Sequence, residues 1–256
     1  MIANFFRSLE AHEVAYLLIS GQATILYGAA TFSEDIDLWV EPSASNVERL
    51  RAALKEADAR YHKLTPPLEP HYVGAGHGFH FVFEPEPVFL DLLGRPPRSR
   101  LFGEAERDSR RFETDWGNIP VIGPRDLIEL KKTQRLADYP IISALTLSVV
   151  ESSDVSAENL RWAVANLFTT ETFFFFNEHY PQWAESPPSG VPSELAGLAG
   201  SPADEIPDSA IEEVSRWMNA AIARHQRADR NYWRPIIEQL RKLRRDRLLM
   251  SEGTPV

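Results

Sequence analysis

Residues 35–40 (Asp-Ile-Asp-Leu-Trp-Val) constrain the fold more than any other part of the chain. Side chains alternate between the two faces of a β-strand, so Asp35 and Asp37 are expected on one face while Ile36 and Leu38 enter the core. Two carboxylates held this close repel each other unless a cation lies between them, and carboxylate oxygens suit Mg²⁺ or Mn²⁺. The spacing therefore predicts a metal site on one face of a sheet. The alternative is a solvated hairpin edge with two surface aspartates.

A small-residue turn, Ser20-Gly21, precedes this segment and follows a buried strand predicted over residues 15–19. Glycine has no side chain and lets the backbone approach a ligand closely. Residues 22–27 suit a short helix ended by Gly28, and the N-terminal amides of a helix favour phosphate. Metal and phosphate would then meet in one cleft.

The order of strand, turn, helix and acidic strand resembles the nucleotidyltransferase superfamily, which has the fold of DNA polymerase β. Its signature is a Gly-Gly or Gly-Ser turn followed some ten residues later by Asp-hydrophobic-Asp, and Ser20 stands where the family usually has glycine. The chain is similar to the bacterial, toxin-like (AbiEii-type) branch over roughly residues 10–145. The resemblance implies an α/β fold, with a mixed sheet, flanking helices and a helical C-terminal region.

A third carboxylate, Asp91, lies in the second of two strands predicted over residues 79–83 and 88–93, which residues 84–87 join. Its neighbours Leu90 and Leu92 would face the core, so Asp91 is expected to face away, with the earlier pair. The resemblance implies that Asp91 completes the metal site or serves as general base. The alternative is an aspartate at a strand edge.

A second block, residues 119–145, predicts a short strand, a helix start and a basic helix. It is similar to a segment of bacterial nucleotidyltransferase-like proteins in which Asp-Leu-Ile-x-x-Lys precedes an Arg and then an Asp. The resemblance implies that a lysine there reaches the triphosphate. We favour Lys131, with Lys132 and Arg135 beside it; the alternative is that all three form a solvated helix face.

Three other segments have chemistry of their own. His77 and His80, at a loop–strand junction, are expected on opposite faces and are interpreted as solvated loop histidines, with zinc ligation as the alternative. Residues 95–111 are dense in arginine and predict either a mobile positive flap near the cleft or a solvated surface. Residues 173–176, four phenylalanines, are predicted to lie in a core.

Composition sets the limits of these predictions. The 256 residues are 43% hydrophobic and 25% charged, with a formal net charge of −10 and no cysteine. Cysteine-free composition excludes disulfides and thiolate metal sites and fits a cytoplasmic protein. The N-terminus lacks the features of a secretion signal, and no stretch reaches the length of a membrane span. The predicted domains are a catalytic one over 1–147 and a helical one over 148–256, with a flexible loop at about 186–207.

These observations predict a metal-dependent nucleotidyltransferase. The resemblance implies that Asp35, Asp37 and Asp91 hold Mg²⁺ or Mn²⁺ and that Ser20, Gly21 and a lysine hold a nucleoside triphosphate such as ATP. The acceptor is RNA, a protein or a small molecule, and the basic residues 224–247 could contact an RNA backbone or lie solvated. A toxin acting on tRNA, with an antitoxin partner, is one version. The alternative is a non-catalytic nucleotide-binding or protein-interaction module.

Overall fold

The computed structural model describes residues 2–85 and 87–256, and the chain forms two compact units. The first unit comprises Met1–Leu130 and Asn231–Val256, and the second comprises Lys131–Arg230. The units differ from the domains expected over 1–147 and 148–256, because the end of the chain returns to the first unit. Glu86, in the predicted 84–87 connection, lies outside the described residues.

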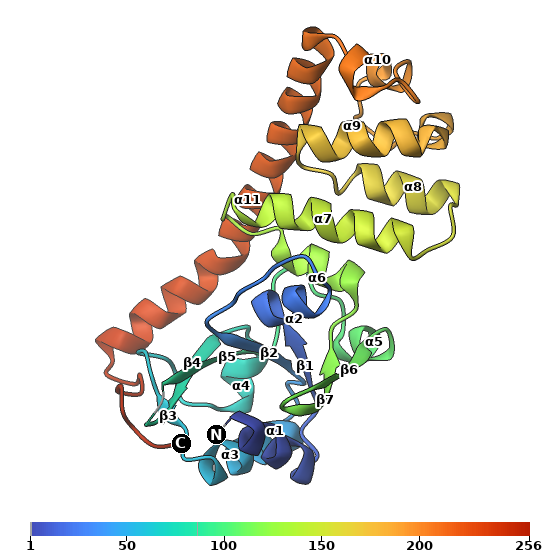
Figure 1. The fold of residues 1–256 in the computed structure, drawn as a ribbon. Coiled ribbons are helices and arrows are strands. Elements are labelled where there is room, and N and C mark those ends of the chain that lie inside the picture. Colours follow the sequence, from blue (N-terminus) through green and yellow to red (C-terminus); the bar gives the residue numbers. More distant parts are fainter. Residues whose placement is uncertain (1, 86) are drawn as a thin grey trace. The chain divides into compact units, whose positions relative to one another are not determined.

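The first unit is α/β, with helices on a mixed sheet, as Figure 1 shows. Its strands are β1 (Tyr16–Ile19), β2 (Ile36–Val40), β3 (Arg60–Tyr61), β4 (Gly78–Phe83), β5 (Val88–Leu93), β6 (Arg110–Thr114) and β7 (Gly117–Val121). Its helices are α1 (Ile2–Ala11), α2 (Ser20–Leu26), α3 (Ala44–Glu56), α4 (Pro70–Gly74), α5 (Phe102–Arg107) and α6 (Pro124–Lys131, of which Lys131 is counted with the second unit).

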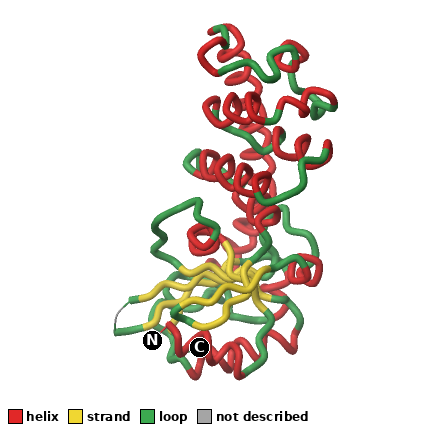
Figure 2. The backbone as a smooth tube through the Cα atoms, turned by 45° about the vertical axis from the view of Figure 1, so that its right-hand side comes forward, coloured by secondary structure: helices red, strands yellow, loops and turns green. Residues whose placement is uncertain are grey.

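The seven strands lie in the order β3-β4-β5-β2-β1-β7-β6. The central pairs β2–β5 and β1–β7 are parallel, and the other neighbours are antiparallel. The predicted fold class, a mixed sheet with flanking helices and a helical region, is confirmed. In this order β2 is the middle strand, with β5 and β1 on either side of it. Figure 2 shows the strands, in yellow, gathered in one sheet.

One face of the sheet is packed with alternate apolar side chains of its strands. Leu38, Leu90 and Phe81 are fully buried, as the period of two along each strand requires. Helices α1 and α3 lie together under this face (Figure 1), and the Phe5 ring of α1 lies 5.0 Å from that of Phe83. The other face carries Asp37, Asp91 and His80 beside the buried apolar residues Leu17, Ile19 and Trp39.

Residues 231–256 complete the first unit. They contain the last part of α11 (Asp208–Arg245) and a tail that pairs with β3. Isolated β-bridges join Arg60 to Pro255 and Thr65 to Met250, and the Tyr61 amide donates a 2.9 Å hydrogen bond to the Thr254 carbonyl. The tail therefore adds a short edge to the sheet beside β3.

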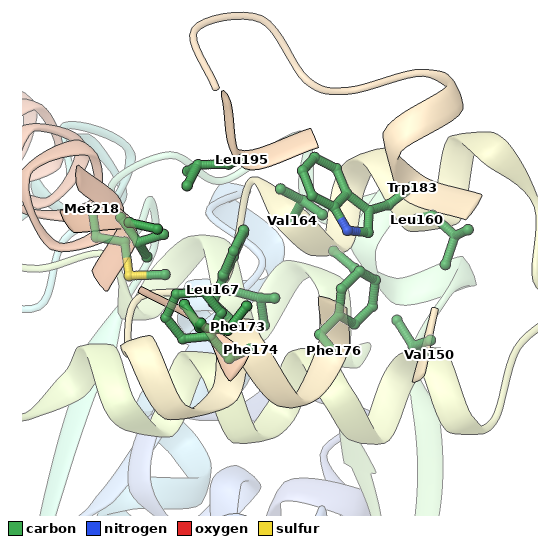
Figure 3. Close-up of a cluster of buried hydrophobic side chains, with 14 residues drawn as sticks. Val150, Leu160, Val164, Leu167, Phe173, Phe174, Phe176, Trp183, Leu195 and Met218 are labelled. Carbon is green, nitrogen blue, oxygen red and sulfur yellow. The ribbon is translucent and has the colours of Figure 1, made fainter. Parts of the chain in front are cut away.

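The second unit is helical. Its elements are α7 (Asp138–Glu151), α8 (Ala157–Val164), α9 (Thr170–His179), η1 (Pro181–Glu185), α10 (Ser193–Ala196), η2 (Ala203–Glu205) and residues 208–230 of α11. Figure 3 shows its core, in which Phe173 and Phe176 of α9 gather with Trp183 of η1. Three of the four phenylalanines predicted as core are buried, and Phe175 is 42% exposed.

Several predicted boundaries shift in the structure. Ser43 caps α3, since its Oγ accepts from the Asn46 amide. The basic helix predicted within residues 119–145 breaks into α6 and α7. Among the described residues, no helix has both the length and the apolar character needed to cross a bilayer.

Candidate active site

The candidate site is a row of polar side chains on the face of the sheet opposite α1 and α3. Asp37 of β2 pairs with Asp91 of the parallel strand β5, and Asp91 pairs in turn with His80 of β4. Neighbouring strands are about 4.8 Å apart, and directly paired residues point to the same face. The sheet register thus confirms the predicted same-face placement of Asp37 and Asp91.

Asp35 is placed differently from the prediction. The strand begins only at Ile36, and Asp35 lies in a bend just before it. Outside the regular strand, alternation no longer places the Asp35 carboxylate beside that of Asp37. The backbone carbonyl of Asp35 accepts a 3.3 Å hydrogen bond from Ser33 Oγ, which ties the bend to the preceding loop.

The carboxylates of Asp37 and Asp91 fit a hard divalent cation. Both residues are half-buried, they oppose each other directly across two strands, and carboxylate oxygens are the ligands that Mg²⁺ prefers. Within residues 2–85 and 87–256, no group of three or more His, Asp or Glu side chains is arranged so that it could hold a metal ion. The ligand set Asp35, Asp37 and Asp91 therefore stays a prediction, with Asp37 and Asp91 its best-placed members.

His80 is a site residue that the sequence interpretation missed. It lies in a strand, and its Nδ1 is 2.7 Å from Asp91 Oδ1, with the two side chains 29% and 26% exposed. The solvated-loop interpretation is wrong for His80. The alternation of Phe79, Phe81 and Phe83 could have identified it, because their burial turns His80 toward the face that carries Asp91.

His77 is also not a solvated loop residue. Its side chain is fully buried, and its Nε2 lies 2.9 Å from Gln239 Oε1 of α11. Burial lowers the pKa of the His77 imidazole, since the charged form loses hydration. His77 therefore acts as a neutral contact between the sheet and α11, within the first unit.

The Ser20-Gly21 pair opens α2 directly after β1. Ser20 adopts φ 58°, the left-handed region, and its carbonyl accepts a 2.7 Å hydrogen bond from Thr24 Oγ1. A Cβ at Gly21 would lie 2.1 Å from Ser33 Oγ, so the close approach that this glycine permits in the structure is to Ser33. A phosphate cradle at Ser20 and Gly21 stays a prediction.

A pocket of about 280 Å³ opens on the carboxylate face. Its polar floor is Asp37, Asp91 and His80. The other lining residues are Leu64, Gly78, Leu92, Leu93, Trp233, Ile236, Ile237 and Leu240. The last four project from one face of α11, since residues three and four apart are neighbours on a helix.

Two contacts hold this part of α11 on the first unit. Gln239 bonds to His77, and the Tyr232 hydroxyl donates to the Arg95 carbonyl. Ile236, between them, is buried. The position of the pocket wall is thus fixed by polar contacts on both sides of a buried apolar residue.

The predicted phosphate-binding cations lie in the second unit. Lys131 and Lys132 are each 6% exposed, which rules out a solvated helix face for these two. Lys131 Nζ lies 3.7 Å from Asp138 Oδ1, and Arg135 Nε donates a 3.1 Å hydrogen bond to Asp138 Oδ2. Arg135 is exposed, as the solvated alternative expects. A role of Lys131, Lys132 and Arg135 in triphosphate binding stays a prediction.

In the arginine-rich segment 95–111, Arg98 and Arg100 make contacts with other parts of the first unit. Arg100 donates two hydrogen bonds of 2.9 and 2.6 Å to the Asp126 carboxylate and another of 2.6 Å to Asp108. These carboxylates raise the pKa of the Arg100 guanidinium. Arg98 donates to the carbonyls of Glu129 and Leu130. Both arginines therefore serve the packing of α6.

Comparison with known proteins finds similarity to solved structures. No protein-family model matches the chain, and no curated protein matches it. Among solved structures, it is similar to a protein from Thermotoga maritima described as a "putative nucleotidyltransferase". The two are 16% identical over 61% of this chain and 86% of that one, with a TM-score of 0.34. Because identity and TM-score are this low, the functional proposal rests on the residues of the site.

Proposed function

We propose that the protein is a metal-dependent nucleotidyltransferase that moves a nucleoside monophosphate from a nucleoside triphosphate to an acceptor hydroxyl. The observation that carries this proposal is the pairing of Asp37 with Asp91 across parallel strands, on a sheet face that opens into a pocket. Two adjacent carboxylates are costly without a cation, and useful with one. The sequence resemblance supports the same chemistry.

Each residue of the row has a role in this proposal. Bound Mg²⁺ or Mn²⁺ would neutralise charge on the α-phosphate and the leaving group. Asp37 and Asp91 hold the cation, and His80 orients the Asp91 carboxylate through the 2.7 Å hydrogen bond. Asp91 is also the candidate base for the acceptor hydroxyl.

The finer assignments are carried over from the resemblance. They place Asp35 among the metal ligands, Ser20 and Gly21 on phosphate through backbone amides, and Lys131 or Lys132 on the leaving pyrophosphate. The same resemblance supplies two more proposals. One is that the nucleotide is ATP, and the other is that the protein is a tRNA-modifying toxin with an antitoxin partner.

The test uses the variants Asp37→Asn and Asp91→Asn, with Asp58→Asn as the matched control. Asp58 is an exposed aspartate whose side chain is 80% accessible, and its replacement removes the same charge from the first unit. Calorimetry measures Mn²⁺ and nucleotide binding, and labelled triphosphates with Mg²⁺ report transfer to cell extract. We expect both site variants to lose transfer by at least about 100-fold while the control keeps it.

Three further outcomes of this test have defined meanings. His80→Gln is expected to lower activity by about 10–100-fold, as loss of an orienting partner does. Full activity of the Asp37→Asn variant would show that the carboxylate pair takes no part in the reaction. Divalent-dependent nucleotide binding in the wild type without transfer to any acceptor would favour the non-catalytic module.

A further inference from the structure

The two edges of the seven-stranded sheet differ in what covers them. At the β3 edge, the tail of the chain adds bridges from Pro255 to Arg60 and from Met250 to Thr65. At the opposite edge, β6 pairs with β7, and in the part of the chain that the structure describes no further strand continues the sheet there (Figure 1). The outward amide and carbonyl groups of such an edge are available to another chain. The β6 edge is therefore the open end of the sheet.

The register of the β6–β7 hairpin shows which backbone groups of β6 point outward. Paired residues of antiparallel strands alternate between pairs that exchange hydrogen bonds and pairs that do not. Arg111 pairs with Pro120, which has no N–H to donate, so this pair and the pair Glu113–Asn118 are of the second kind. The N–H and C=O groups of Arg111 and Glu113 therefore point away from β7. Among the described residues, neither N–H donates to another backbone group.

The side chains at these two positions carry opposite charges and lie at the surface. Arg111 and Glu113 are exposed, and Phe112 between them is half-buried, with its ring centroid 5.4 Å from that of Tyr27. One guanidinium nitrogen of Arg111 donates a 2.9 Å hydrogen bond to the Asn118 carbonyl, and the group has further N–H donors. Charged side chains on an edge strand keep other chains away where like charges meet, so the order of the charges decides their effect.

An antiparallel copy of the same strand brings opposite charges together. When two β6 strands pair about a two-fold axis through Phe112, Arg111 of each copy opposes Glu113 of the other. Both residues have outward N–H and C=O groups, so each of these pairs is one that exchanges hydrogen bonds. A two-fold axis through Arg111 or through Glu113 would instead oppose two arginines or two glutamates, which is destabilising. The order of the charges in β6 thus favours one register of self-pairing.

We propose that the β6 edge, residues 110–114, binds a second copy of this chain, and that the two copies form a symmetric dimer in which their sheets join through antiparallel β6 strands. Charge complementarity favours a second copy over an unrelated strand, because the two-fold axis forms the ion pair between Arg111 and Glu113 twice. The interface lies in the first unit and uses neither Asp37 nor Asp91. The inference is therefore independent of the proposed nucleotidyl transfer.

Charge reversal at the two positions tests the interface and its register. Sedimentation velocity of the full chain over roughly 1–300 μM protein measures the dissociation constant of the dimer. Arg111→Glu and Glu113→Arg each place like charges opposite each other twice, so each should raise the dissociation constant by at least about tenfold. An equimolar mixture of the two variants should associate again, because every arginine then opposes a glutamate. The chain with both substitutions should dimerise like the wild type.

The matched controls are Glu48→Arg and Arg51→Glu, which reverse the charges of an exposed ion pair on α3. Both should leave the dissociation constant unchanged, and circular dichroism shows whether each variant melts like the wild type. Raising the salt concentration should weaken the dimer of the wild type, because the ion pairs at the edge are exposed.

Amide hydrogen exchange of the wild type tests the backbone contacts without any substitution. At high protein concentration, exchange should slow at the N–H groups of Arg111 and Glu113, which the second copy covers. Exchange at Phe112 should not depend on concentration in this way, because its N–H already bonds to Ile119 within the hairpin. Protection that increases with concentration but spares Arg111 and Glu113 would overturn the proposal.

Three results of sedimentation would also overturn it. One is a wild-type chain that stays monomeric over the whole concentration range, which would mean that the charges only shield the edge. Another is a dimer that Arg111→Glu and Glu113→Arg affect no more than the two α3 controls do. The last is a mixture of the two β6 variants that does not associate although each variant melts like the wild type.

Discussion

Replacement of Gly21 by alanine separates two explanations for a glycine at this position: close packing against Ser33 and close approach of a bound phosphate. In the structure, a Cβ at Gly21 would lie 2.1 Å from Ser33 Oγ and 2.7 Å from Ser33 Cβ, closer than the 3.0 Å below which real Cβ atoms essentially never come. A clash of this size costs about 1–3 kcal/mol. Gly21 is not among the glycines with positive φ, so alanine also gains about 0.5–1 kcal/mol of helix preference. The net expected loss for Gly21→Ala is therefore about 0–2.5 kcal/mol.

The change in the free energy of unfolding that Gly21→Ala causes should reverse its sign when Ser33 is replaced by glycine. With the Ser33 side chain gone, the nearest remaining atom is Ser33 Cα at 3.9 Å, an ordinary contact. Gly21→Ala should then stabilise the first unit by about 0.5–1 kcal/mol. Ser33→Ala keeps the Cβ at 2.7 Å and should relieve the clash only in part. The coupling free energy between the two positions is therefore about 1–3 kcal/mol.

Thermal unfolding followed by circular dichroism measures the wild type and the three variants of this cycle, with a shift of roughly 2–4 °C per kcal/mol for a unit of this size. Hydrogen exchange of the α2 amides locates the change. Equal effects of Gly21→Ala with serine or glycine at position 33 would refute the clash. Nucleotide affinity adds a second readout: Ser33→Gly should restore it if alanine clashes with Ser33, and should not if alanine clashes with bound phosphate.

Three other outcomes follow from the structure. Burial lowers the pKa of His77, so the fold is more stable above a pH of about 6.5, where this imidazole is neutral, and loses this stability as the pH falls below that value. His77→Gln should therefore make the melting temperature less dependent on pH between about pH 7 and 5. The same substitution at the exposed His71 should leave the pH dependence unchanged. Trp183→Ala should destabilise the second unit by about 3–5 kcal/mol in chemical unfolding, because a fully buried indole is removed. Lys131→Met should destabilise that unit by about 1–3 kcal/mol, and Asp138→Asn in the same background should recover part of the loss; no recovery would show that the ion pair does not contribute.

Local patterns predicted the parts of the site that lie within single strands. The alternation around Asp91 placed its carboxylate on the correct face, and the same alternation would have placed His80 had it been applied to β4. The start of β2 was not predictable in this way, because Phe32 continues the apolar pattern although it is 74% exposed. A periodic signal does not show where a partner strand stops offering hydrogen bonds.

Long-range features were beyond the reach of sequence patterns. The apolar positions Trp233, Ile236, Ile237 and Leu240 have helical spacing that can be read directly, but the dense arginines around them suggested a phosphate-binding surface instead. Nothing local indicates that this stretch packs on the carboxylate face, since the choice of partner depends on residues far away in the chain. The β-bridges from Pro255 to Arg60 and from Met250 to Thr65 have the same cause.

The interruption of the first unit by residues 131–230 has a consequence for synthesis. Closing a connection of about 100 residues costs on the order of 4 kcal/mol of chain entropy, which the packing of residues 231–256 must offset. During translation, β1, β2, β4 and β5 emerge well before α11, so the strands that carry the acidic row leave the ribosome before the residues that cover it. The pocket exists only after Trp233, Ile236 and Ile237 have left the ribosome. A nascent chain therefore has the carboxylates before it has the pocket wall that encloses them, and that wall arrives in the last tenth of the sequence.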